Sequence, residues 1–367
     1  MALFFCALLA LPQLFTAEAR GQSAAAPACT AAEAVASLGI GGQPDFPPFE
    51  VVPAATPVAT TLQIDGASHE IFLYPARPVD PATGGRLIAA DALSGAVLWD
   101  SQRSAAALPA ALEHAPALLE DDQGRAYRAY LGDAAGNVWR LDIPRESVAE
   151  WRLSLLADLA GLAGGGGTVS FPVGPDLFLG VDGIGRPFDG LVLPVLVETV
   201  AGRRIDLLLL RDYALDQGVA LEPVRATDLV AARDCESPGC PPDTGPGWHL
   251  ADAAPGDALA VVPLIDGGRI FLATHARLSL ACDDASAERF LVIVDLESAL
   301  PLFGGDDGDA FALGRRVLDG PRPEGGVVHL QGMDEALAAR GVAENVLEAR
   351  GLAVSRLYWL DLLLDSD

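Results

Sequence analysis

The sequence contains no lysine, because all 24 basic residues among its 367 are arginine. Schiff-base catalysis, a P-loop lysine and a lysine general base are therefore excluded. Against these stand 50 acidic residues, which give a net charge of −26. A chain this acidic lacks the basic stripes that replace counterions on nucleic acid or on anionic lipid headgroups. We expect neither as a partner.

Hydrophobic runs long enough for a membrane span are also missing. Residues 1–19 hold an apolar stretch followed by the small-x-small site of Ala17 and Ala19, which is typical of a cleaved secretory signal peptide. The stretch is shorter than the roughly 20 residues that a spanning helix needs. We expect export and no membrane span in the mature chain; a buried first helix is the alternative.

Cysteine is scarce, with five residues, one of which leaves with the signal peptide. The C-x-x-C spacing of redox and zinc sites is absent, and the histidines show neither H-x-H nor H-E-x-x-H. Cys235 and Cys240 flank a Ser-Pro-Gly turn that can close a local disulfide. Export permits such bonds. By elimination, Cys29 and Cys282 would form the second pair.

Most of the remaining sequence predicts β-strands. Residues 20–57 form an Ala/Pro-rich lead-in, and from 58 to 367 short apolar runs alternate with Gly, Pro, Asp and Asn clusters. Short apolar runs separated by turn residues favour an all-β sandwich, barrel or propeller over a parallel α/β sheet. Helical spacing occurs at 154–162 and 333–350, which predicts two inserted helices.

A faint repeat favours the propeller. Two segments place an aspartate before a tight glycine turn and a tryptophan on the returning strand, and residues 294–297 echo them without the tryptophan. Aspartate can bond the turn's amides, glycine supplies positive φ, and indole fills the gap between wedge-shaped sheets. The alternative is two unrelated hairpins; a true repeat implies about six or seven blades. The motif residues are Asp91, Gly95 and Trp99, then Asp133, Gly136, Asn137 and Trp139.

Residues 115–143, with the block GDAAGNVWRLDI, resemble the signature blade of the PilY-type family of type IV pilus biogenesis and tip-associated adhesins. Weaker matches follow in order as far as residue 364, including IDLLLLRDY, GWHL and RLYWLDLL. The resemblance implies a modified, quinoprotein-dehydrogenase-like β-propeller at the periplasm, pilus tip or cell surface. It also implies a role in pilus assembly and adhesion, with minor pilins or the tip complex as partners.

The blade loop of this family binds calcium, and its positions fall on residues 119–127 here. Only Asp121 keeps a carboxylate and Gln123 a neutral oxygen, while Leu119 and Tyr127 stand at other ligand positions. Calcium takes about six to eight oxygen ligands. We expect a degenerate loop held by turn hydrogen bonds, no functional calcium site and no cofactor.

The sequence offers no convincing catalytic constellation. It has neither the vicinal cysteine pair of quinoprotein dehydrogenases nor a G-x-S-x-G elbow, and the glycines at 164–167 precede a strand rather than a helix. We predict a non-enzymatic protein. The alternatives are a periplasmic or outer-membrane propeller scaffold and a quinoprotein-like propeller enzyme.

Overall fold

The computed structural model describes most of the chain between residues 50 and 299 and three short strands beyond. The described ranges are 50–64, 67–78, 84–103, 108–112, 114–145, 147–215, 221–234, 244–256, 258–259, 263–266, 268–275, 289–299, 311–314, 322–324 and 327–329. The predictions for the signal peptide, for the helix at 333–350 and for both disulfides lie outside these ranges. The residues of those disulfides are Cys29, Cys235, Cys240 and Cys282.

Two antiparallel meanders come first. The first sheet has the order β1-β2-β3-β4, with β1 (Val58–Ile64), β2 (Ala67–Ala76), β3 (Arg86–Asp91) and β4 (Val97–Asp100). The second sheet contains β5 (Ala117–Glu120), β6 (Ala126–Gly132), β7 (Asn137–Asp142) and β8 (Arg152–Asp158), and β13 (Val224–Arg225) adds to β8 in parallel. Each strand in these meanders pairs with the strand before it, as short turns dictate.

Two further sheets follow. The third is built of β10 (Asp176–Val181), β11 (Pro187–Thr199), β12 (Gly202–Asp212), β15 (Gly247–Ala254) and β14 (Val230–Ala231), and β9 (Thr168–Ser170) pairs with β11. The fourth contains β16 (Ala258–Leu259), β17 (Leu264–Asp266), β18 (Arg269–His275), β19 (Arg289–Asp295) and β20 (Phe311–Gly314). A separate pair joins β21 (Arg322–Glu324) to β22 (Val327–His329).

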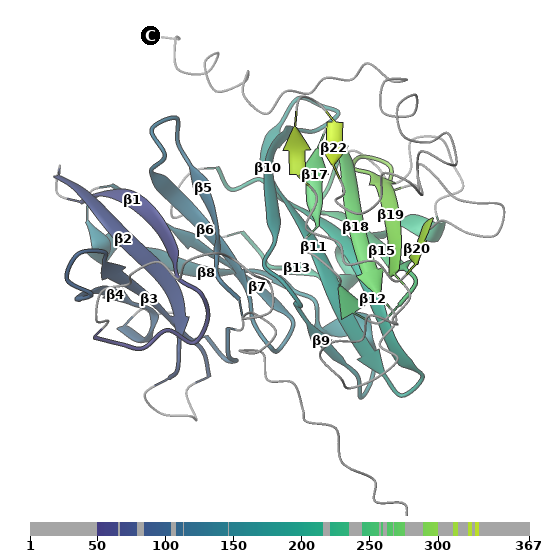
Figure 1. Ribbon diagram of the computed structural model, residues 1–367, viewed down its shortest axis with the longest axis horizontal. Coiled ribbons are helices and arrows are strands. Elements are labelled where there is room, and N and C mark those ends of the chain that lie inside the picture. The colour runs from purple at the N-terminus through teal and green to yellow at the C-terminus, as the bar shows by residue number, and fades with distance from the viewer. Residues whose placement is uncertain are drawn as a thin grey trace, which may run out of the picture.

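The four larger sheets follow one another in chain order across the molecule (Figure 1). A parallel bridge joins Thr61 of β1 to Arg125 just before β6, while β10 contacts both β5 and β17. Successive antiparallel sheets that pack against one another in chain order are the arrangement of propeller blades. The fold is all-β and propeller-like, as the sequence predicts.

Each seam between neighbouring sheets holds one hydrophobic cluster. Leu131 and Leu141 face the first sheet, Val138 and Leu191 lie between the second and third sheets, and Trp248 lies between the third and fourth. Alternate residues of β6 and β7 therefore serve two different seams, because side chains of a strand point to opposite faces in turn.

One predicted helix is wrong. Residues 154–162 form most of β8 followed by a single 3₁₀ turn, η4 (Ala160–Ala163). The backbone of β8 pairs with β7, with Leu155 opposite Trp139, while Leu156 and Ala157 are buried. Strand pairing and burial on both faces outweigh the helical spacing of the leucines. All helices among the described residues are short 3₁₀ turns, and none there could cross a membrane.

The end of the lead-in packs onto the first sheet. The Tyr74 hydroxyl donates to the Val51 carbonyl at 2.9 Å, and the Ala54 amide donates to the Pro75 carbonyl at 2.8 Å. Burial raises the pKa of Tyr74 to about 12. Residues 50–57 thus contribute to the first blade.

Candidate functional site

The aspartate turn predicted at 132–139 forms one hydrogen-bonded unit. Asp133 is buried, and its Oδ1 accepts from the amides of Ala135 and Asn137 at 2.9 and 3.0 Å. Its Oδ2 accepts from Asn137 Nδ2 and Trp139 Nε1, both at 2.9 Å. Gly136 supplies the left-handed backbone, with φ of 82°. The structure brings all four motif residues together, so the block ties a turn to a tryptophan buried between two sheets.

The same turn occurs at Asp121 and at Asp182, which the sequence repeat did not include. In both, the aspartate amide donates to the carbonyl of the arginine four residues on, at 2.9 Å. Nε of that arginine, Arg125 or Arg186, returns to the aspartate Oδ2 at 2.8 Å. The pattern D-x-x-G-[N/R] is the sequence signal that identifies Asp182.

A second turn type recurs at Asp91 and Asp295. Oδ1 of each aspartate accepts from the hydroxyl of the serine three residues on, at 2.6 Å for Ser94 and 2.8 Å for Ser298. Trp99 is buried and lies 5.5 Å from Trp151 between ring centres. At the other turn the tryptophan comes from the neighbouring sheet, because Trp248 Nε1 donates to the Leu296 carbonyl at 3.1 Å.

The loop matched to a calcium site is filled by protein groups. Asp121 Oδ1 accepts from the amides of Gln123 and Arg125, and Oδ2 is paired with Arg125 and, at 2.8 Å, with Arg145. Tyr127 is half-buried, and burial raises its pKa to about 12. Among the described residues no group of three or more His, Cys, Asp and Glu side chains could hold a metal ion. The absence of calcium binding stays a prediction.

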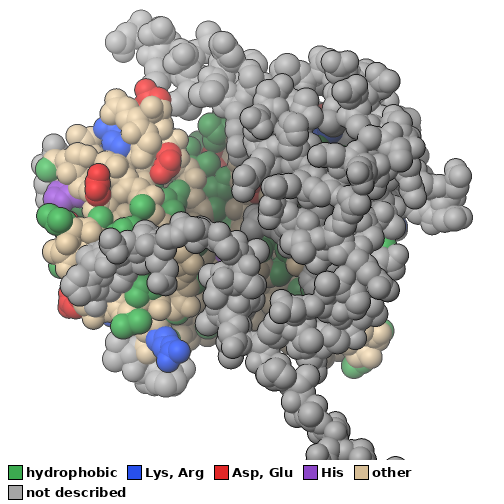
Figure 2. Space-filling view, in the orientation of Figure 1, with side chains coloured by type: hydrophobic (Ala, Val, Ile, Leu, Met, Phe, Trp, Pro, Cys, Tyr) green, Lys and Arg blue, Asp and Glu red, His purple; other side chains and the backbone are tan. Residues whose placement is uncertain are grey.

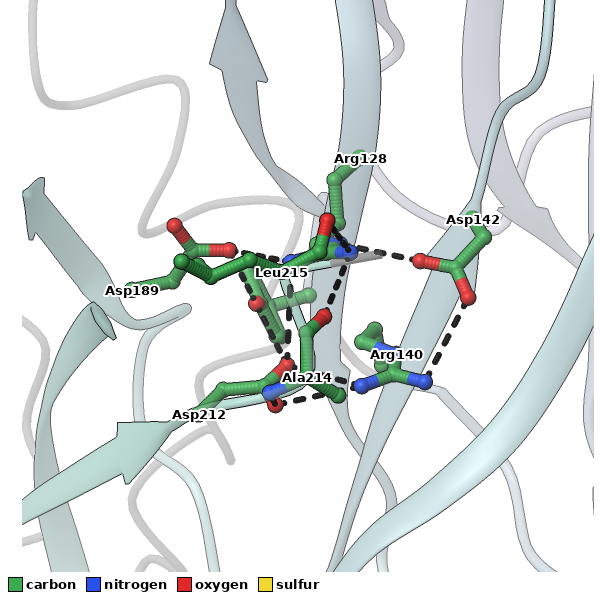
Figure 3. A network of polar contacts seen from close by, with 8 residues as sticks. Arg128, Arg140, Asp142, Asp189, Asp212, Ala214 and Leu215 are labelled. Atoms are coloured by element: carbon green, nitrogen blue, oxygen red, sulfur yellow. Dashed lines mark hydrogen bonds and ion pairs between the residues drawn. The ribbon is translucent and has the colours of Figure 1, made fainter. Parts of the chain in front are cut away.

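The strongest concentration of buried charge lies between the second and third sheets (Figure 3). Arg128 of β6 pairs through Nε with Asp142 of β7 at 2.9 Å, and through Nη1 with Asp189 of β11. Arg140 of β7 pairs with Asp212 of β12 at 3.1 Å and with Asp142 at 3.4 Å. All five side chains are at most 3% exposed. We call these five residues, together with Tyr130, the seam network.

Uncharged groups complete the seam network. Arg128 Nη2 donates to the carbonyls of Ala214 and Leu215, at 2.8 and 3.3 Å. The Tyr130 hydroxyl lies 2.9 Å from Asp189 Oδ2 and 2.8 Å from Asp212 Oδ2. The Ala214 amide donates to Asp212 Oδ1 at 3.0 Å. One guanidinium therefore joins two sheets and the loop that follows β12.

Burial sets the electrostatics of the seam network. It raises the pKa of Asp189 despite the opposing pull of Arg128. Burial also raises the pKa of Tyr130 well above its ordinary value, helped by the two nearby carboxylates. For Arg128, burial lowers the pKa, but the surrounding oxygens more than compensate and the net pKa is raised. The arginine stays charged and Tyr130 stays a neutral hydroxyl.

Paired guanidinium groups bind carboxylates and carbonyls; they neither attack substrates nor accept protons. A small pocket adjoins the seam network, lined among others by Arg140, Arg211, Asp212 and Glu222. Figure 2 shows charged side chains standing apart on the described part of one face, without a single-sign patch there. The ion pairs of the seam network hold two neighbouring blades together.

A smaller polar cluster lies elsewhere in the third sheet. Asp206 is fully buried and accepts from Arg204 Nε at 2.8 Å and from the Asp252 amide at 2.9 Å; His249 Nε2 lies 2.9 Å away. Burial would raise the pKa of Asp206, but the contacts with His249, Arg204 and the amide lower it below its ordinary value.

Sequence reasoning missed the seam network. Arg128 and Asp142 are close in the sequence, but Asp189 and Asp212 lie 61 and 84 residues from Arg128. With 24 arginines and 50 acidic residues in the chain, composition alone cannot identify which of them pair. The available signal is a charged residue inside an otherwise apolar strand, as with Arg128 in β6 and Arg140 in β7.

Comparison with protein-family models and with curated proteins gave no match. Among solved structures, the C-terminal domain of Pseudomonas aeruginosa PilY1 is similar at 15% identity and a TM-score of 0.45, over 66% of this chain and 58% of that domain. The β-propeller domain of Cps50 (Swd1) from Myceliophteria thermophila is similar at 10% identity and a TM-score of 0.20, over 42% of this chain and 48% of the other. The chain therefore spans about half the length of either structure. The assignment of a propeller-like fold relies on the sheet arrangement described above.

Proposed function

We propose that this chain is an exported, non-enzymatic type IV pilus biogenesis or tip-associated protein that supports pilus assembly and surface adhesion. The observation that carries the proposal is the block at 132–143, which resembles the signature blade of the PilY-type family. Minor pilins or a pilus tip complex are the corresponding partners.

The geometry of the block supports a binding scaffold. Its polar side chains are engaged inside the fold: Asp133 and Asn137 close the turn, and Arg140 and Asp142 belong to the seam network. A quinoprotein-like propeller enzyme would instead need polar groups directed at a substrate. The block therefore supports a rigid blade that displays other surfaces.

Deletion of the gene tests the proposal. We expect reduced piliation and reduced twitching, with both restored by the wild-type chain. A tagged chain should co-fractionate with sheared surface pili and should be lost from that fraction in a strain without the major pilin. Normal piliation and twitching in the deletion strain would refute the proposal. Retention with outer-membrane assembly partners would favour the scaffold alternative.

A further inference from the structure

The charges of the seam network do not balance. Two arginines, Arg128 and Arg140, face three aspartates, Asp142, Asp189 and Asp212, so that full ionisation leaves one negative charge. Every one of these side chains is essentially closed to solvent. An uncompensated charge at such a depth is costly, and proteins relieve it by taking up a proton.

The hydrogen atoms of the same network do not balance either. Tyr130 lies within hydrogen-bond distance of Oδ2 of both Asp189 and Asp212, at 2.9 and 2.8 Å. A phenolic hydroxyl carries one proton and can donate it to one acceptor at a time. If both carboxylates are ionised, one of these two contacts places two oxygen lone pairs against each other.

One added proton corrects both imbalances. We propose that the folded protein holds an additional proton on Asp189, which donates to the Tyr130 oxygen while Tyr130 donates to Asp212. The two short contacts then become two hydrogen bonds. The seam network becomes neutral, with two positive and two negative charges.

The contacts place the proton on Asp189 rather than on Asp212. Asp212 is stabilised as an anion by Arg140, which reaches both of its oxygens at 3.1 Å, and by the Ala214 amide. The hydrogen bonds of Asp189 within the described part of the chain, from Arg128 and with Tyr130, both use Oδ2. Fewer donors at a buried carboxylate favour its neutral form, and burial raises the pKa of Asp189 in the same direction.

Loss of this proton would act on the seam between two blades. Alkaline pH would leave one unbalanced negative charge between the second and third sheets, which would weaken their contact. Within the described part of the chain, the titratable and charged groups around Asp189 include Tyr127, Arg128 and Tyr130 on β6, Arg140 and Asp142 on β7, and Asp212 on β12. The pocket beside Arg140 and Asp212 adds Arg211 and Glu222. We therefore infer a proton-dependent seam.

Infrared spectroscopy of protein labelled with ¹³C-aspartate reports the proton directly. At neutral pH we expect the carbonyl band of a protonated aspartic acid, shifted by the label, which disappears in Asp189→Asn and persists in the matched control Asp121→Asn. Asp121 is near the surface and doubly paired with arginine. In wild-type protein the band should vanish at alkaline pH.

Stability measurements give the second readout. The unfolding equilibrium constant of the wild type relative to Asp189→Asn should rise up to tenfold per pH unit above about pH 4, where the unfolded state has lost this proton and the folded state still holds it. The rise should level off once Asp189 loses its proton in the folded state as well. Absence of the band at neutral pH, its persistence in Asp189→Asn, or a pH-independent ratio would overturn the proposal. If Asp189→Asn does not fold, the presence and titration of the wild-type band decide the matter.

Discussion

Ala299 occupies, in the turn that begins at Asp295, the left-handed backbone position that Gly95 occupies in the turn that begins at Asp91. Their φ angles are 55° and 71°, and in both turns the amide of this residue donates to the aspartate carbonyl, at 3.0 and 2.8 Å. The echo of the repeat at residues 294–297 is thus a real copy of the turn. It is built with an alanine where glycine would carry no strain.

This difference predicts unequal responses to substitution. Gly95→Ala should lower the free energy of unfolding by about 1–2 kcal/mol, the cost of a left-handed non-glycine residue. Ala299→Gly should change it by less than about 1 kcal/mol, because relief of strain is offset by the loss of a buried methyl group. Denaturant unfolding of both variants measures the two changes. A neutral Gly95→Ala variant would contradict the assignment of strain to this position.

Trp139 should matter for stability through its packing and through one hydrogen bond. We expect Trp139→Ala to lower the free energy of unfolding by about 3–5 kcal/mol. Trp139→Phe keeps most of the buried ring but removes the donor to Asp133, so a smaller loss of about 1–3 kcal/mol is expected. Chemical denaturation monitored by circular dichroism distinguishes the two. Wild-type stability of Trp139→Phe would show that the indole nitrogen contributes nothing, and equal losses in the two variants would show that ring packing contributes nothing.

Arg128 should tolerate no replacement by a shorter or non-planar cation. Arg128→Ala removes the guanidinium that pairs with both Asp142 and Asp189 inside the seam, and we expect a loss of about 3–5 kcal/mol. Arg128→Lys keeps the charge but cannot reach both carboxylates and the Ala214 carbonyl at once, so it should fall between wild type and Arg128→Ala. Thermal unfolding in one buffer ranks the three proteins. Wild-type stability of Arg128→Lys would show that the planar guanidinium group is not required at this position.

Two buried carboxylates should have opposite effects on the pH dependence of stability. The folded pKa of Asp206 is below its unfolded value of 3.8, so its contribution is present above about pH 4 and is lost as the solution becomes more acidic. The folded pKa of Asp189 is raised, so its contribution is complete below about pH 4 and is lost as the pH rises. The slope for one proton is at most about 1.4 kcal/mol per pH unit.

Asparagine variants separate these two contributions. The difference in unfolding free energy between the wild type and Asp206→Asn should grow as the pH rises through the acidic range. The difference between the wild type and Asp189→Asn should shrink as the pH rises above 4. Slopes of the same sign would show that one of the two directions is wrong.

Calcium should have no effect at the loop around Asp121. Both oxygens of this carboxylate are engaged by amides and by Arg125 and Arg145, so a cation would have to displace two guanidinium groups. Titration calorimetry on the purified protein should detect no saturable site tighter than about 10⁻⁴ M. A tighter site that Asp121→Ala removes would contradict this expectation.

Local pattern alone was sufficient for much of the fold. The apolar runs predicted strands, and the D-x-x-G pattern predicted the turn in which Asp133, Gly136 and Trp139 meet, because hydrogen bonds within a few residues depend little on the rest of the chain. The pattern failed at 154–162, where leucines at helical spacing form β8. There the free edge of β7 supplied backbone partners that no local signal contains.

By itself, the sequence determined the all-β class, the turn chemistry and the exclusion of lysine-based chemistry. Only the tertiary structure decided which charges are buried and which partners they have. Asp189 and Asp212 face each other on the paired strands β11 and β12, and Arg128 of β6 meets them because the second and third sheets pack together. The energy of a buried charge depends on its neighbours and its depth, so that pairing, and the proton we infer from it, exist only once the second and third sheets have come together.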